Sequence, residues 1–284
     1  MLIAGSDCLV LLWHAVLSSI LELILSAMKN FFGIPPSPQN ALDLFQGSWS
    51  SRMPPGEGRD GLVAGESYLY GDLRLEWCFR HTGSLQGQRA LEIGPLEASH
   101  TYMLEKAGVL SVDAVEANGG AYLRCLIVKE ILGLSRSRFH LGDALKFLDA
   151  SSTHYDFGLA CGVLYHQVEP LRFLRLLLEH CQQVLIWTVL FNSDWVERHP
   201  EWSHKFGEEV DASEGEFHCK LRRYRYKDAL AWSGFCGGGE DFALWFTRAD
   251  LLRAIAHLGF EVVAVQDEEH SYSPAITVFA RKAV

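Results

Sequence analysis

The chain has 284 residues, of which 49% are hydrophobic and 21% charged. This composition excludes a disordered or fibrous chain and predicts a globular protein, built as one large domain or as one domain with an inserted subdomain. The formal net charge of −10 argues against a general nucleic-acid binder, because affinity for polyanions depends on a basic surface.

Residues 1–32 are predicted to form an apolar N-terminal helix. The few polar side chains in the apolar run recur every four residues, at His14, Ser18, Glu22 and Ser26. On a helix they form one polar stripe. A membrane span tolerates Glu22 badly, and no basic residue precedes the run as a secretory signal requires. Three interpretations remain: a helix docked on this domain or on a second copy in a homo-oligomer, a helix in contact with a membrane surface, or an extension upstream of a start at Met28.

The cysteines are scattered, with no C-x-x-C pair and no Cys/His cluster at zinc-ligand spacing. There are seven: Cys8, Cys78, Cys125, Cys161, Cys181, Cys219 and Cys236. They predict buried thiols in a reducing compartment, and hence a cytoplasmic protein.

Residues 33–87 are predicted to be a lid or lead-in to the main domain. The segment is rich in Pro, Ser and Gly and contains a short helical pattern at Asn40–Phe45. A free linker would not carry large apolar side chains such as Phe45 and Trp49. A second helix is expected over residues 72–82.

From residue 88 to residue 284, strands alternate with helices. Strands are expected at 89–93, 112–115, 139–141, 155–160, 184–189, 260–265 and 275–281, and helices at 99–106, 121–132, 168–181 and 247–258. This alternation predicts an α/β fold with a doubly wound, mostly parallel seven-stranded sheet, which binds ligands beyond the carboxyl ends of its strands. Residues 192–246 interrupt the alternation and are predicted to form an inserted cap.

The strongest motif is Leu91-Glu-Ile-Gly-Pro-Leu-Glu-Ala98, where the first strand turns into the first helix. A glycine there lets the backbone approach a ligand, and the helix N-terminus offers free N–H groups. Of the dinucleotide pattern G-x-G-x-x-G only Gly94 is present, with Leu96 and Ser99 at the other glycine positions. NAD is therefore disfavoured, and a ligand without a pyrophosphate fits better.

Three further segments follow the next strands. Glu116 ends the second strand, about 22 residues after Gly94, where a carboxylate accepts ribose hydroxyls. Asp143 follows the third strand and is expected to contact an adenine edge, to cap the next helix, or both. The fourth strand opens into Gly162-Val-Leu-Tyr-His166, which holds two titratable side chains.

In chain order, these four segments resemble the class I S-adenosylmethionine-dependent methyltransferases, over roughly residues 88–189 and the closing strands. The resemblance implies a Rossmann-like methyltransferase fold with S-adenosyl-L-methionine as cofactor. The first loop would hold its methionine end, the second-strand acid its ribose and the third-strand aspartate its adenine. The cofactor-binding residues implied are Glu92, Gly94, Leu96, Glu116, Ala117, Asp143, Ala144 and Cys161. This chain has Leu96 and Ala98 where the family usually has glycine.

The run Gly162–His166, followed by Glu169-Pro, is similar to the corresponding loop of the wobble-uridine tRNA carboxymethyl-transferring branch of this superfamily. The similarity concerns the subfamily and not the substrate. Methyl transfer is an in-line displacement that needs a base only where the acceptor loses a proton. His166 or Tyr165 is the expected base, with packing at the loop as the alternative for His166. No metal is expected.

The insert contains a basic, aromatic stretch, Lys220–Lys227, which suits an anionic or sugar acceptor, a nucleobase stack or an exposed strand. The leading functional hypothesis is methyl transfer to a hydroxyl or amine of a small-molecule or glycan-like acceptor. The alternatives are a tRNA-modifying enzyme of the same superfamily, which the net charge disfavours, and a catalytically silent cofactor-binding scaffold protein.

Overall fold

A computed structural model describes residues 32–231, 237–270 and 273–283. The chain divides into two compact units, with the boundary between Leu44 and Phe45. In the first unit the described part holds helix α2 (Pro38–Asp43), capped by the Ser37 side chain. Residues 1–31 lie outside the described residues, so the interpretations of the apolar segment stay predictions. No helix in the described part of the chain is both long and apolar enough to cross a membrane.

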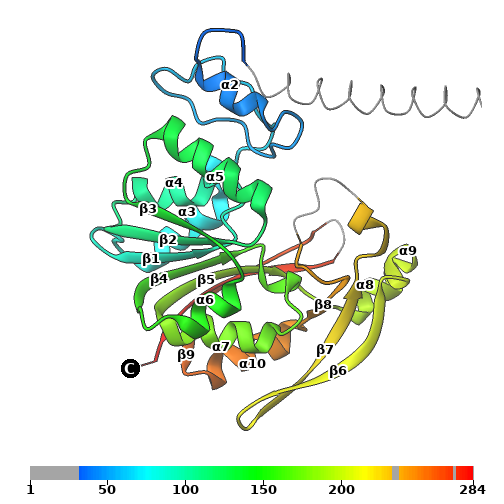
Figure 1. Cartoon of the computed structure of the whole chain (residues 1–284). Coiled ribbons are helices and arrows are strands. Elements are labelled where there is room, and N and C mark those ends of the chain that lie inside the picture. Colours follow the sequence, from blue (N-terminus) through cyan, green and yellow to red (C-terminus); the bar gives the residue numbers. More distant parts are fainter. Residues whose placement is uncertain (1–31, 232–236, 271–272, 284) are drawn as a thin grey trace, which may run out of the picture. The chain divides into compact units, whose positions relative to one another are not determined.

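The second unit is built on a seven-stranded sheet with the order β3-β2-β1-β4-β5-β10-β9 (Figure 1). Its strands are β1 (Arg89–Ile93), β2 (Ser111–Glu116), β3 (Ser137–Leu141), β4 (Tyr155–Cys161), β5 (Cys181–Val189), β9 (Phe260–Glu268) and β10 (Ala275–Lys282). β10 runs antiparallel to both of its neighbours, and the other pairs are parallel. The predicted doubly wound, mostly parallel sheet is confirmed.

Helices cover both faces of this sheet (Figure 1). One face carries α3 (Leu73–Thr82), α4 (Ser99–Lys106) and α5 (Gly119–Leu132), and the other carries α6 (Ala144–Ala150), α7 (Pro170–His180) and α10 (Arg248–His257). The main core lies between the sheet and α7, whose Phe173, Leu174 and Leu177 are fully buried. Four of the cysteines, Cys78, Cys125, Cys181 and Cys219, are buried free thiols, as predicted.

Helix α7 and strand β5 begin at other residues than the sequence predicts. The helix starts at Pro170, because proline lacks the N–H that the first helical turn leaves unpaired. β5 starts at Cys181 rather than at residue 184, because Cys181 already pairs with Tyr155 of β4. The hydrophobic pattern does not reveal this extension, because Gln182 and Gln183 are polar.

The insert 192–246 holds α8 (Ser193–Arg198), α9 (Pro200–Ser203) and a three-stranded antiparallel sheet. The sheet consists of β6 (Phe206–Glu214), β7 (Phe217–Arg225) and β8 (Phe242–Trp245). On β7, Phe217 and Leu221 are buried and join the main core. At the base of the insert, the Phe191 N–H donates to the Phe246 carbonyl over 2.9 Å.

The basic stretch of the insert is an alternating strand whose charges are matched. Each of its cationic side chains on β7 pairs with an acid of β6: Lys220 and Arg222 with Glu209, and Arg223 and Arg225 with Glu208. Tyr224, between Arg223 and Arg225, is buried. The strand interpretation of this stretch is confirmed, and its cations are already engaged by the neighbouring strand.

Candidate active site

The loop after β1 turns sharply at Gly94, which has a φ of 71°. Its N–H donates to Val115 over 2.9 Å, and a Cβ here would lie 2.7 Å from the Val163 side chain. Leu96 and Ala98 also have left-handed backbones, with φ of 54° and 59°. Such conformations cost about 1–3 kcal/mol in residues other than glycine and concentrate at functional sites. The loop therefore has the left-handed backbone that favours glycine at two positions, Leu96 and Ala98, that are not glycine.

Glu116, the last residue of β2, is hydrogen-bonded to the loops that follow β1 and β3. It is 8% exposed, and its carboxylate accepts the N–H groups of Leu96 over 3.1 Å and Asn118 over 2.8 Å. Its carbonyl accepts the Gly142 N–H over 2.9 Å. Burial raises the pKa of Glu116, although N–H groups including that of Ala117 oppose the rise. The predicted site residues of the first three loops are thus brought together at one edge of the sheet.

Glu92, at the end of β1, is fully buried and incompletely paired. One carboxyl oxygen, Oε2, accepts the Thr101 hydroxyl. The other, Oε1, has no hydrogen-bond partner among the residues that the structure describes. Burial raises the pKa of Glu92 to about 7, against the opposing influence of His100 and Thr101. A buried unpaired acceptor is costly, so this atom is a place where a donor group of a ligand would be stabilised.

Asp143 caps α6: its carboxylate accepts the Lys146 N–H over 2.9 Å, and Ala144 is the first residue of the helix. The capping role is confirmed. The side chain is exposed, and its contact with an adenine edge stays a prediction.

Replacing Asp143 with alanine is expected to lower the free energy of unfolding by about 1 kcal/mol, because the cap of α6 is lost. Asp143→Asn keeps an acceptor oxygen and should restore most of this loss. Urea unfolding of the two variants and the unmodified chain measures the effect. Equal stability of all three proteins would contradict the capping contribution.

The loop after β4 faces the insert. Cys161 ends β4, and a 3₁₀ turn, η2 (Leu164–His166), follows. His166 Nδ1 hydrogen-bonds the Tyr226 hydroxyl over 2.8 Å, and burial lowers the pKa of His166 to about 4. The Tyr165 ring packs edge-on against Trp187. His166 is therefore neutral near pH 7, and the catalytic assignments of His166 and Tyr165 stay predictions.

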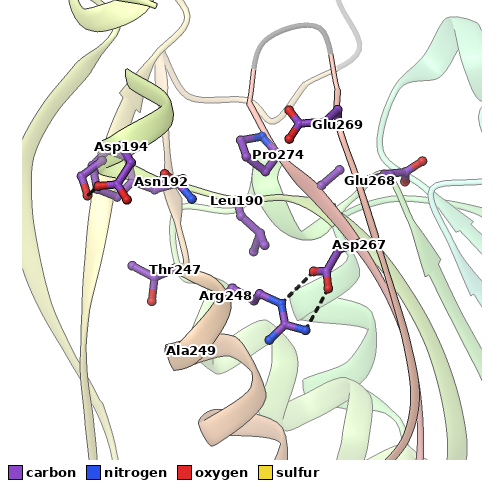
Figure 2. Close-up of a pocket in the computed structure, with 13 residues that line it drawn as sticks. Leu190, Asn192, Asp194, Thr247, Arg248, Ala249, Asp267, Glu268, Glu269 and Pro274 are labelled. Atoms are coloured by element: carbon purple, nitrogen blue, oxygen red, sulfur yellow. Dashed lines mark hydrogen bonds and ion pairs between the residues drawn. The ribbon is translucent and has the colours of Figure 1, made fainter. Parts of the chain in front are cut away.

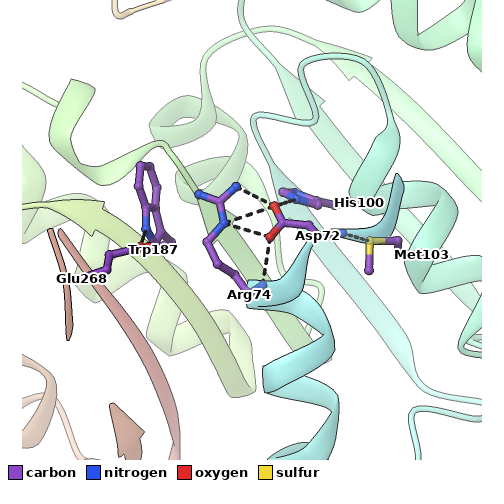
Figure 3. Close-up of polar contacts among 6 residues, drawn as sticks. All are labelled: Asp72, Arg74, His100, Met103, Trp187 and Glu268. Carbon is purple, nitrogen blue, oxygen red and sulfur yellow. Dashed lines mark hydrogen bonds and ion pairs between the residues drawn. The ribbon is translucent and has the colours of Figure 1, made fainter. Parts of the chain in front are cut away.

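A polar network that sequence reasoning missed lies beside Cys161 (Figure 3). The Asp72 carboxylate caps α3. It also accepts a hydrogen bond from Arg74 Nη2 over 2.5 Å and lies 2.8 Å from His100 Nε2. Burial alone would raise the pKa of Asp72, but His100 and Arg74 outweigh it and hold that pKa far below its usual range. The network continues to Trp187, whose ring centroid lies 4.5 Å from the Arg74 guanidinium carbon and whose indole N–H donates to Glu268.

A second missed residue, Glu97, holds the lead-in against the β1 loop. Its fully buried carboxylate accepts the N–H groups of Ser50 over 2.7 Å and Ser51 over 2.9 Å, and lies 3.6 Å from Arg124 Nε. No local pattern pointed to Glu97, because its partners lie more than 40 residues earlier in the chain. Residues 45–87 therefore pack with the sheet domain.

Among the residues that the structure describes, Asp72, His100 and Cys161 form one group with metal-ligand chemistry, with their ligand atoms within 4.8 Å of one another. The Asp72 carboxylate already binds the Arg74 guanidinium. Burial raises the pKa of the Cys161 thiol to about 12, so it is protonated near neutral pH. A cation beside a protonated thiol does not favour a metal ion.

A cavity of about 420 Å³ lies beyond the carboxyl end of β5, at the base of the insert (Figure 2). Its apolar wall comes from Leu190, Phe191, Pro274 and Ala275, and its carboxylates from Asp194, Asp267, Glu268 and Glu269. Arg248 also lines it, and its Nε and Nη2 bind the Asp267 carboxylate over 2.7 and 2.9 Å. Because this pair is neutral, the other three carboxylates make the cavity acidic.

No family model matches the chain, and no curated protein does. Solved structures do. One is the N-terminal domain of EvdMO1, crystallised in the presence of S-adenosylhomocysteine (SAH) and D-fucose. It aligns with a TM-score of 0.62 at 22% identity, over 87% of this chain and 95% of that one. The magnesium protoporphyrin IX methyltransferase ChlM from Synechocystis PCC 6803, with bound SAH, aligns at 0.51 and 13%, over 76% and 92%. A putative methyltransferase from Bacillus halodurans aligns at 0.53 and 11%, over 75% and 100%. At these identities the likeness establishes the architecture: the chain has the Rossmann-like fold of the S-adenosylmethionine-dependent methyltransferases.

Proposed function

We propose that the protein is an S-adenosylmethionine-dependent methyltransferase that acts on a hydroxyl or amine of a small-molecule or glycan-like acceptor. The observation that carries the proposal is the Glu116 carboxylate, held at the end of β2 by the left-handed β1 loop. It lies on the neighbouring strand to β1, beside the point between β1 and β4 where the strand order reverses. Ligands of doubly wound sheets bind at such a point.

The residues at this edge fit the cofactor. Oε1 of Glu92 is a buried acceptor without a partner, which suits the ammonium group of the methionine end. Glu116 retains lone pairs for the ribose hydroxyls, and Asp143 lies at the next loop for the adenine edge. SAH in the EvdMO1 and ChlM structures supports this assignment. When bound, the cofactor supplies a methyl group on a positively charged sulfur.

The chain's own contribution would be alignment and proton handling. We assign to His166 the role of the base that takes the proton lost by the acceptor. Its imidazole is neutral at pH 7, and one ring nitrogen is held by the Tyr226 hydroxyl. Tyr165 is the alternative group on the same turn. Because its pKa is low, His166 is a weak base. It would take the proton only after the bond to the methyl group has begun to form and has made the acceptor more acidic.

The cavity at the base of the insert is the candidate acceptor site. Its volume of about 420 Å³ suits a small molecule, and its net negative charge disfavours phosphate-rich acceptors. The matched charges on β7 remove the feature that favoured tRNA as an acceptor, and the tests below include tRNA as an alternative outcome. The D-fucose used with EvdMO1 supports a sugar-like acceptor.

The first experiment is calorimetric titration of the full chain with S-adenosylhomocysteine (SAH). We expect binding tighter than millimolar, as for ordinary enzyme ligands. Absence of binding at that level would overturn the methyltransferase and cofactor-scaffold hypotheses together.

The second experiment separates the acceptors. With S-adenosylmethionine, release of SAH is measured over a panel of neutral sugars and amino sugars, with tRNA as a parallel arm. Turnover of a sugar supports the proposal. Salt-sensitive tRNA binding with methylation would select the tRNA hypothesis instead, and SAH binding without any turnover would select the scaffold.

A further inference from the structure

The insert holds the turn η2, which carries His166, by its backbone. The Trp245 indole N–H donates to the Tyr165 carbonyl over 2.8 Å, and the Leu244 N–H donates to the Gln167 carbonyl over 2.9 Å. Both donors belong to β8. The carbonyls on either side of His166 are therefore fixed by the insert, so the place of the imidazole depends on the insert as well as on the sheet domain.

We propose that Tyr226, which directly follows β7 in the insert, is a positioning residue for His166. Its phenol oxygen accepts the Nδ1–H of His166 and so leaves the lone pair of the imidazole on Nε2, the nitrogen that takes the proton of the acceptor. This inference rests on the proposed function, in which His166 is the base. It gives the insert a part in the methyl-transfer step itself, besides shaping the cavity.

The first argument is the contact and what it decides. His166 Nδ1 lies 2.8 Å from the Tyr226 hydroxyl oxygen. Burial lowers the pKa of His166 to about 4, so near pH 7 the ring is neutral and carries a single N–H. The hydrogen bond made by one ring nitrogen sets which nitrogen carries the proton and which carries the lone pair. Tyr226 is therefore placed to set the tautomer of His166.

The second argument is the direction that a base requires. If the hydroxyl donated to Nδ1, the imidazole proton would lie on Nε2, and neither nitrogen could take a proton. With Nδ1–H donated to Tyr226, the lone pair on Nε2 takes the acceptor's proton while the acceptor's oxygen or nitrogen binds the methyl group. The sulfur keeps the electron pair of the broken bond. The hydrogen bond from Nδ1 to Tyr226 is the same before and after this transfer.

The third argument is rigidity. The Tyr226 side chain is 4% exposed, and the Tyr226 N–H donates to the Asp241 carbonyl over 3.1 Å. Its ring packs edge-on against Tyr224, which is stacked on Trp245 with 4.2 Å between the ring centroids. Trp245 is also the residue that holds the Tyr165 carbonyl. One group of packed aromatic side chains therefore fixes both the phenol and the turn, and keeps the oxygen beside Nδ1.

The first test determines the tautomer directly. Long-range nitrogen–proton NMR spectra of the full chain with isotope-labelled histidine separate a ring nitrogen that carries a proton from one that carries a lone pair. The variant His166→Gln identifies the signals of His166 among those of the 12 histidines. Near pH 7 the unmodified chain should have the His166 proton on Nδ1. Tyr226→Phe, which keeps the ring and removes the hydroxyl, should shift the population toward the Nε2–H tautomer.

The second test is kinetic and uses the SAH-release assay with the panel of neutral and amino sugars. Tyr226→Phe should lower kcat by about 10- to 100-fold, because the base then has its lone pair on the wrong nitrogen in most molecules. The KM of the acceptor and the affinity for SAH should stay the same, since Tyr226 acts through His166 and not on either ligand.

Tyr155→Phe is the matched control, because its buried hydroxyl donates to Asp113 over 3.2 Å at the start of β4, the opposite end from the turn. It should leave the His166 tautomer and kcat unchanged. The Nε2–H tautomer in the unmodified chain would overturn the inference, and this result needs no variant. So would an unchanged tautomer or an unchanged kcat in Tyr226→Phe. If no acceptor is turned over, the proposed function fails, while the NMR spectra still decide whether Tyr226 sets the tautomer.

Discussion

Replacing Glu116 with alanine is expected to weaken SAH binding by at least tenfold. The variant loses a carboxylate that would accept ribose hydroxyls, and a tenfold change corresponds to about 1.4 kcal/mol, within the range of one charge-assisted hydrogen bond. It also leaves the N–H groups of Leu96 and Asn118 without their acceptor, so the β1 loop loses one of its links to β2. Calorimetry with SAH, at a temperature where circular dichroism shows the variant folded, measures the effect.

Two further variants separate the ribose contact from the loop contact. Glu116→Gln keeps one acceptor oxygen and should weaken SAH binding less than alanine does. Glu130→Gln, on the exposed side of α5, should leave the affinity unchanged. Unchanged affinity in Glu116→Ala would refute the ribose role.

Replacing Glu92 with glutamine is expected to remove a pH dependence of stability. Burial raises the pKa of Glu92 from 4.5 to about 7 in the folded chain. Below pH 4.5 the carboxyl group is protonated in both folded and unfolded chains and makes no difference. As the pH rises toward 7 the unfolded chain releases this proton while the folded chain retains it, so the folded state loses stability. The loss reaches about 3 kcal/mol above pH 7, from about 1.4 kcal/mol per pKa unit.

The measurement is urea unfolding of both proteins at pH 4.5 and pH 8.5, because glutamine carries no titratable proton. The stability of Glu92→Gln relative to the unmodified chain should rise by about 3 kcal/mol between these two pH values. Other titrating groups cancel in that difference. Glu76→Gln, an exposed carboxyl on α3, should show no such rise. Parallel pH profiles for Glu92→Gln and the unmodified chain would contradict the raised pKa.

The fold and the first three loops of the site could be predicted because their signals are local. A strand that turns into a helix leaves a short pattern, and Glu92, Gly94 and Glu116 all lie within such patterns. The neighbouring strand ends are brought together by the parallel sheet itself, so no further information was needed to place them at one edge.

The loop after β1 shows where counting glycines misleads. Leu96 and Ala98 stand where the methyltransferases that this sequence resembles usually have glycine. Both residues nevertheless adopt the left-handed backbone that glycine usually provides. A conformation can be imposed by its surroundings, here the Glu116 carboxylate on the Leu96 N–H, at a cost in strain that a residue pattern does not reveal.

The Asp72–Arg74–His100 network was not predictable, for a different reason. Asp72 and His100 lie 28 residues apart and on different helices, and Trp187 lies on a strand much later in the chain. Only the packing of α3 against β5 and β10 brings these side chains together. The matching of the basic β7 strand by Glu208 and Glu209 likewise depends on strand register, which composition does not encode.

The hydrogen bond between Phe191 and Phe246 joins the two ends of the insert at its base. The ends of the intervening segment are therefore held together, and doubling the length of a loop between fixed ends costs only about 0.6 kcal/mol in closure entropy. Provided that Phe217, Leu221 and Leu244 keep their places in the core and Tyr226 its contact with His166, the exposed parts of the insert can diverge in length and sequence. Evolution can therefore exchange the surface beside the acidic cavity while the strand ends around Glu92 and Glu116 stay as they are, so acceptor choice and cofactor binding can change independently.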